Sequence, residues 1–101
     1  MIVEYIRYEL KDHSAEELLG GYDTAATHLR AAPECLSYEV AQCEEDPNSV
    51  TVRILWSSTV AHLTGFRRSP NFPPFLDAIR PFIPDIAEMR HYEVMDSWSR
   101  G

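Results

Sequence analysis

The sequence lacks a long apolar run and is short of positive charge. Its 101 residues carry 9 Lys or Arg against 16 Asp or Glu, which gives a net charge of −7. Such an acidic chain repels phosphate backbones and anionic lipids, so binding to nucleic acid or to a membrane surface is not expected. The longest uncharged stretch, Ile54–Phe66, is too short to span a bilayer. Charges at Glu4, Arg7 and Glu9 also interrupt the apolar region that a signal peptide needs. We therefore expect a cytoplasmic protein.

Cysteines and cofactor motifs are also scarce. Cys35 and Cys43 are the only two cysteines, and both fall in a segment that is predicted to be a strand. In an extended strand they lie roughly 26 Å apart, whereas a disulfide needs Cα atoms within about 7 Å. No intramolecular disulfide is expected. The sequence has no CxxC pair, His–Cys cluster, GxGxxG or P-loop, and so predicts no metal and no cofactor.

What is present is the composition of one globular domain, expected to span residues 1–101. Hydrophobic residues make up 45% and charged residues 25%, which is typical of a folded domain with one core. The predicted elements, in chain order, are a strand over Ile2–Leu10, a helix between Ser14 and Pro33, strands over 36–43 and 50–56, a short helix capped by Ser58 or Thr59, a second helical stretch over 72–79, and a strand over 86–95. Gly20-Gly21 lies inside the first helix, where each glycine costs about 1 kcal/mol relative to Ala. Either another backbone approaches there or the helix bends.

The order strand, helix, strand, strand, helix, strand predicts an α+β, ferredoxin-like βαββαβ fold. Both helices then cover one face of a four-stranded antiparallel sheet. The other face is expected to mix apolar and charged side chains, from Val3, Tyr5 and Arg7, from Met89, His91 and Glu93, and from Leu55 and Ala41. Because this surface is too apolar for open solvent, we expect a homodimer that forms through the sheet face.

Three stretches carry a resemblance to a known family. The runs Trp56–Ser58 and His62–Phe72, together with Glu88–Glu93, resemble the antibiotic biosynthesis monooxygenase (ABM) family. The resemblance covers essentially the whole chain. It implies a dimeric α+β barrel with one pocket per subunit between the helices and the sheet. It also implies a small monooxygenase that acts on a phenolic, quinol or polyketide-like aromatic substrate with dioxygen, and without metal, flavin or haem.

Oxygenation without a cofactor requires removal of a substrate proton, so a base near neutrality is the first requirement. His62 is the preferred candidate, because it falls in the first turn of the short helix, where the helix dipole disfavours the imidazolium. Tyr8 and Trp56 are expected to orient the substrate oxygens. His91 is placed on the dimer face, where pairing with an acid is expected. The residues predicted to line the pocket are Ile6, Phe66, Phe72, Phe75 and Tyr92.

Each of these residues also has a structural interpretation, since an aromatic stripe, a tryptophan or a lone histidine is more often simply packed in the core. The alternative function is accordingly a non-catalytic dimeric module that binds a small aromatic ligand or assists another enzyme. The presence or absence of ionisable side chains in the pocket distinguishes these two functions. An oxygenase needs at least one ionisable group facing the apolar pocket, and a binding module needs none.

Overall fold

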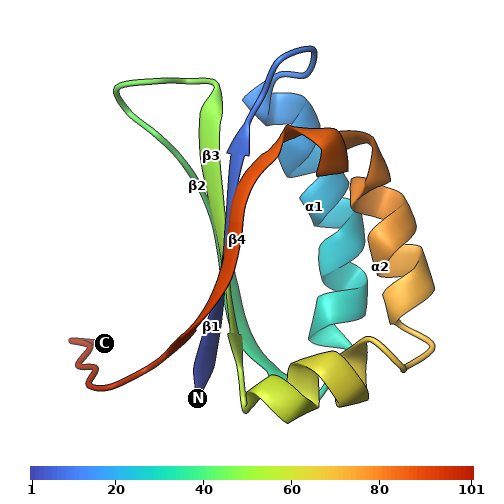
Figure 1. The fold of residues 1–101 in the computed structure, drawn as a ribbon, viewed down its shortest axis with the longest axis vertical. Helices are drawn as coiled ribbons and strands as arrows, with labels where there is room; N and C mark the ends of the chain where they lie inside the picture. The colour runs from blue at the N-terminus through green and yellow to red at the C-terminus, as the bar shows by residue number, and fades with distance from the viewer.

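The computed structural model describes residues 1–101 as a four-stranded antiparallel sheet with the helices on one face (Figure 1). The elements are β1 (Ile2–Glu9), α1 (Ala15–Arg30), β2 (Cys35–Gln42), β3 (Ser49–Trp56), the π-helical segment η1 (Ala61–Phe66), α2 (Phe72–Ile79), the 3-10 segment η2 (Arg80–Asp85) and β4 (Ile86–Glu93). The sheet order is β2-β3-β1-β4. The predicted ferredoxin-like α+β fold is confirmed. None of the helices has the length and hydropathy needed to cross a membrane.

The centre of the sheet is formed by β1 and β3, whose alternating side chains build the core. On β1 the helix-facing positions are Glu4, Ile6 and Tyr8, and all three are buried. On β3 the corresponding residues are Val50, Val52, Ile54 and Trp56, each no more than 2% exposed. Burying one large apolar side chain contributes about 1.5–3 kcal/mol to the stability of the fold. The burial of these residues therefore favours a single register between β1 and β3. Glu4 is the one charged residue among them.

The start of α1 is fixed by a capping box. The Ser14 hydroxyl accepts a hydrogen bond from the Glu17 N–H, and the Glu17 carboxylate accepts one from the Ser14 N–H, both at 3.1 Å. Caps of this kind contribute about 1 kcal/mol. The helix then buries one stripe against the sheet, made of Leu18, Tyr22, Ala25, Ala26 and Leu29.

Gly21 allows the two helices to approach each other closely. A Cβ at this position would lie 2.7 Å from Phe82 Cε2 and 3.1 Å from the Ala78 carbonyl oxygen, whereas a Cβ at Gly20 would meet nothing within 4 Å. Of the two outcomes expected for this glycine pair, the close approach is the one found. It brings α2 and η2 against α1, and these segments enclose the space above the sheet.

The alternation of β4 differs from the prediction. His91 pairs directly with Glu4, and Met89 pairs with Ile6. Directly opposed residues in an antiparallel pair share a face, so these β4 side chains lie on the helix side. The prediction that Met89 and His91 line the uncovered face was therefore wrong, whereas Glu93, at the end of β4, does line the groove on that face.

Tyr92 also lies on the opposite face of the sheet from the one predicted, and a β-bulge in β4 accounts for both differences. It was predicted to lie on the helix side, but it lies on the uncovered face, where its ring packs edge-on against Tyr5 with centroids 6.2 Å apart. The pairing of β1 with β4 shifts between Arg7 and Tyr8, which marks a β-bulge. Ile86 faces the helices, and in a regular strand every second residue after it, up to Tyr92, would face them too. The bulge adds one residue, so that beyond it the alternate residues Met89 and His91 face the helices instead.

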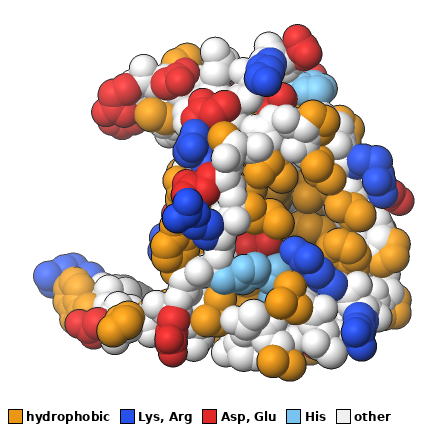
Figure 2. All heavy atoms as spheres, viewed as in Figure 1, with side chains coloured by type: hydrophobic (Ala, Val, Ile, Leu, Met, Phe, Trp, Pro, Cys, Tyr) orange, Lys and Arg blue, Asp and Glu red, His pale blue; other side chains and the backbone are white.

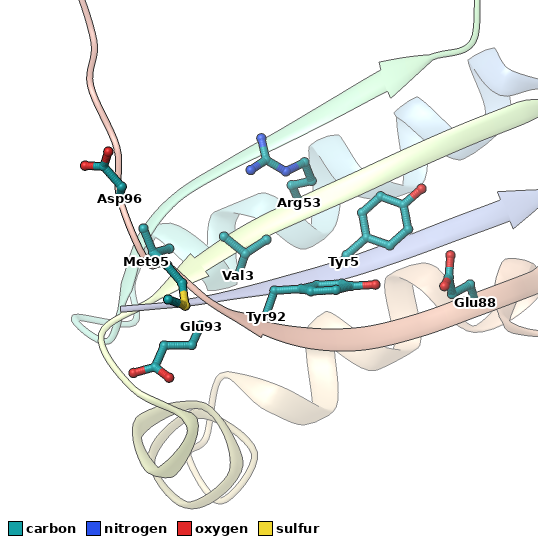
Figure 3. Close-up of a pocket in the computed structure, with 9 residues that line it drawn as sticks. Val3, Tyr5, Arg53, Glu88, Tyr92, Glu93, Met95 and Asp96 are labelled. Carbon is teal, nitrogen blue, oxygen red and sulfur yellow. The ribbon is translucent and has the colours of Figure 1, made fainter.

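The uncovered face of the sheet carries a groove of about 510 Å³ between the strands and the C-terminal segment (Figure 3). Val3, Tyr5 and Tyr92 point to this side, and β4 continues into a segment that extends away from the helices (Figures 1 and 3). On the same face Arg53 and Glu39 form an ion pair at 2.6 Å. The face is thus mixed apolar and charged, as predicted, although β4 contributes Glu88 and Tyr92 beside Glu93, in place of Met89 and His91.

Candidate active site

A second cavity lies between the sheet and the helices and has a volume of about 150 Å³. Figure 2 shows it as a hollow lined with hydrophobic side chains, with a carboxylate, a histidine and a basic side chain at its lower end. The groove on the uncovered face is larger, but we regard the smaller cavity as the site, because the buried ionisable groups of the chain converge on it. The predicted residues that line it are Ile6, Tyr8, Trp56, His62, Phe66, Phe72 and Phe75.

The predicted site residues do not include two charged residues of this cavity, Glu4 and Arg67. It also placed Tyr92 here, whereas Tyr92 lines the groove on the opposite face. The signal for Glu4 was present in β1. Glu4 shares the alternation of Ile6 and Tyr8, and a carboxylate on the apolar face of a strand is rarely buried without a partner.

One wall of the cavity is aromatic. The Phe66 ring lies 5.0 Å from Trp56, 5.7 Å from Phe72 and 5.2 Å from Phe75, measured between centroids, and it meets the two phenylalanines edge-on. Edge-to-face pairs are favourable by about 0.5–1.5 kcal/mol beyond the area they bury. These rings hold a fixed apolar surface that suits a flat aromatic ligand.

Tyr8 lines the cavity and forms a pair of hydroxyls with Tyr22. The Tyr8 and Tyr22 oxygens are 2.7 Å apart, and both side chains are buried. Burial raises the pKa of Tyr8 to about 12 and that of Tyr22 well above its usual value. Both groups therefore remain protonated near neutrality and can act as hydrogen-bond donors, but not as bases.

Glu4 is the buried carboxylate of the cavity, with only 4% of the residue exposed. Its Oε1 accepts a hydrogen bond from the Trp56 indole N–H at 3.1 Å. The indole was predicted to orient a substrate oxygen, but in the structure its N–H is directed at this carboxylate. Burial raises the pKa of Glu4, while the Trp56 hydrogen bond and the positive charge of Arg67 act in the opposite direction. A carboxylate poised in this way is a suitable proton acceptor.

His62 lies between Glu4 and His91. Its Nε2 is 3.3 Å from Glu4 Oε1, its Nδ1 is 2.8 Å from His91 Nε2, and its ring stacks on Trp56 with centroids 4.5 Å apart. Burial lowers the pKa of His62 to about 4, and the charges of Arg67 and His91 act in the same direction. His62 is therefore a neutral imidazole near neutrality.

The backbone around His62 holds the ring in place. The Ser58 hydroxyl accepts a hydrogen bond from the Ala61 N–H at 2.9 Å, which caps the turn as predicted. The Arg67 N–H donates to the His62 carbonyl at 3.1 Å, and this bond over five residues is the π-helical pattern. Such segments occur frequently at functional sites. The widened turn keeps both His62 and Phe66 buried against the sheet.

Glu4, His62 and His91 are also the one group of three potential metal ligands in the chain, with ligand atoms within 4.8 Å of one another. His62, however, presents Nε2 to Glu4 and Nδ1 to His91. The three side chains thus form a row of successive contacts rather than a ring of donors around one centre.

Comparisons with known proteins bear on the family and the fold. A family model described as antibiotic biosynthesis monooxygenase matches residues 1–78. A comparison with curated proteins finds no match.

Several solved structures share the fold. A variant of SnoaB from Streptomyces nogalater, described as a cofactor-independent oxygenase, superposes with a TM-score of 0.78 at 15% identity, over 98% of this chain and 97% of that one. A protein from Chloroflexus aurantiacus J-10-fl whose description carries the same family name gives a TM-score of 0.77 at 21% identity, over 99% and 98% of the two chains. One from Bordetella bronchiseptica gives 0.74 at 18% identity, over 93% and 96%. At these identities the likeness establishes the fold.

Proposed function

Since the chain belongs to the antibiotic biosynthesis monooxygenase family, whose model matches residues 1–78, we propose that it is a small cofactor-independent monooxygenase. Its substrate is a phenolic or quinol ring, alone or as the end of a larger polyketide-like aromatic, and its oxidant is dioxygen. The observation that carries this proposal is the presence of Glu4, His62 and Arg67 in an otherwise apolar cavity. A module that only binds an aromatic ligand has no need for buried ionisable groups, which are costly to desolvate.

The size of the cavity supports a single ring at the reacting centre. A cavity of about 150 Å³ lined by apolar side chains can hold benzene, and the present cavity has about this volume. Any further rings of a larger substrate extend through the opening towards solvent. The aromatic wall around Phe66 holds the ring flat, and the apolar surroundings keep water away from reactive intermediates.

The Glu4–His62 pair is the proposed proton acceptor. The sequence favoured His62 alone, but both of its ring nitrogens face protein partners, so Glu4 presents the acceptor oxygen to the substrate and His62 lies behind it. Removal of the proton leaves an electron-rich anion, which Arg67 stabilises and which reduces dioxygen. At an activated ring CH₂, one oxygen atom enters as C=O and the other leaves as water, so that the four electrons come from the substrate.

We further propose a homodimer that forms through the uncovered sheet face. Val3, Tyr5, Leu55 and Tyr92 give this face an apolar character, and helices cover only the other face. A two-fold related copy would complete a dimeric α+β barrel and remove these side chains from water. The active-site cavity opens on the helix side, so dimerisation leaves it accessible.

The test is oxygen consumption with a panel of hydroquinones, naphthols and anthrones in chelator-treated buffer. We expect uptake with at least one of them, and a loss of roughly 10²–10⁴-fold in His62→Ala, the range for removal of a general base or its immediate partner. The matched control is His28→Ala on α1, which should retain the wild-type rate. No uptake across the panel, with saturable binding of the same phenols, would favour the binding module instead.

A further inference from the structure

His91 connects the buried pair to the outside of the molecule. Its side chain is exposed, whereas only 3% of His62 and 4% of Glu4 is exposed. His91 lies on β4 directly opposite Glu4 on β1, and its Nε2 is 2.8 Å from His62 Nδ1. A row of three proton-carrying groups therefore leads from the floor of the cavity to solvent, in steps of 3.3 Å and 2.8 Å.

We propose that Glu4, His62 and His91 form a proton relay between the cavity and solvent, with His91 as its outer end. The relay deepens the proposed monooxygenase function and rests on it. It also explains why His62 has a different partner at each ring nitrogen. An imidazole that receives a proton at one nitrogen and releases one from the other passes charge through itself without turning.

In one turnover, the relay releases as many protons to solvent as it takes up. When the substrate gives its proton to Glu4, Glu4 passes a proton to His62 Nε2, His62 Nδ1 passes one to His91 Nε2, and His91 Nδ1 releases one to water. After dioxygen has reacted, the same steps run inwards and return a proton to Glu4, which gives it to the peroxide anion. One proton leaves and one enters, and the inward run restores the starting tautomers of both histidines.

The charged surroundings favour a relay over a metal site. The groups that act on the two imidazoles are Glu4 from β1, Arg67 after η1, and the histidines themselves, and Arg67 lies close enough to oppose the positive form of each. A guanidinium next to the row would also repel a divalent cation. The positive charge of Arg67 also disfavours an imidazolium at either histidine, so a proton passes through the neutral imidazoles and is not stored on them.

The first test compares wild type, His91→Ala and the control His28→Ala at saturating substrate in weakly buffered solution. We expect His91→Ala to lower the rate of oxygen consumption by roughly tenfold or more, and added imidazole to restore it in a concentration-dependent way, since a small diffusible base can occupy the vacated outer position. His28→Ala should be unaffected. An unchanged rate in His91→Ala, or a loss that imidazole does not restore, would overturn the relay.

The second test needs no turnover. Nitrogen-15 NMR measures how fast the His62 ring proton exchanges with water, and the relay predicts slower exchange in His91→Ala than in wild type, with imidazole again reversing the change. Equal exchange in the two proteins would overturn the relay. If the wild type consumes no oxygen with any substrate, the proposed function fails, and this exchange measurement still decides whether the relay exists. A cobalt(II) absorption band that depends on His91 would identify the cluster as a metal site instead, and would also overturn the relay.

Discussion

Replacement of the buried carboxylate by its amide, Glu4→Gln, separates the catalytic role of this residue from its structural one. The glutamine keeps the volume of the side chain, and its carbonyl oxygen can still accept the Trp56 N–H that Glu4 Oε1 now accepts at 3.1 Å. What is lost is the group that takes the proton. General-base catalysis is worth roughly 10²–10⁴-fold, and at 1.36 kcal/mol per tenfold this raises the barrier by about 3–5.5 kcal/mol.

The same substitution should increase the stability of the folded protein near neutrality. Burial raises the pKa of Glu4 above the ordinary value of 4.5, so ionising this carboxyl costs more in the folded state than in the unfolded state. That cost is absent below about pH 4.5, where both states are protonated, and it grows as the pH rises towards the folded-state pKa. Glu4→Gln should therefore melt at a higher temperature than wild type at pH 7, with the difference vanishing near pH 4.

The assay combines oxygen consumption at pH 7 with thermal melts at both pH values. Glu9→Gln is the matched control, because Glu9 lies on the same strand but is paired with Arg7 away from the cavity. Glu9→Gln should leave the rate of oxygen consumption unchanged. Its melting temperature should differ from that of wild type by the same amount at pH 7 and at pH 4. A Glu4→Gln protein that retains the wild-type rate would show that Glu4 is not the proton acceptor, and one that is destabilised at pH 7 more than at pH 4 would show that ionisation of Glu4 does not cost stability.

Three further predictions concern the surroundings of the site. Trp56→Phe keeps most of the packing but removes the N–H that Glu4 accepts, so it should raise the pKa of Glu4 further, shift the pH–rate profile upwards and cost about 1–3 kcal/mol of stability. Gly21→Ala places a methyl group 2.7 Å from Phe82 and should destabilise the fold by about 1–3 kcal/mol in denaturant titration; an unchanged midpoint would show that the helices can separate freely. Leu55→Asp puts a charge into the proposed dimer face and should reduce the light-scattering mass from twice 11.6 kDa to that of the monomer, whereas a wild type that is already monomeric would exclude the dimer.

The sequence was most informative where local rules decide the outcome. The Ser14–Glu17 capping box, the Ser58 cap and the alternation along β1 and β3 are set by residues a few positions apart, and each is found as predicted. The aromatic wall followed from the same periodicity, because Phe72 and Phe75 occupy one face of a short helix.

The sequence was least informative where a long-range pairing decides the outcome. The bulge opposite Arg7 inverts the alternation of β4, and it moves His91 to the cavity side and Tyr92 to the other. Nothing in the local pattern of β4 marks that extra residue. Glu4 was missed for a related reason: the alternation of β1 puts it on the buried face, but its partner Trp56 lies 52 residues away in the sequence.

In the proposed reaction, this cavity inserts one atom of dioxygen into an aromatic substrate without help from a bound cofactor. Mass spectrometry of the product formed under ¹⁸O₂, in chelator-treated buffer and with protein shown to be free of flavin and haem, tests it directly. We expect one ¹⁸O atom per product molecule, formed at a rate that Glu4→Gln lowers by roughly 10²-fold or more. Product oxygen that derives from water, or labelling that is equally fast in the variant, would contradict it.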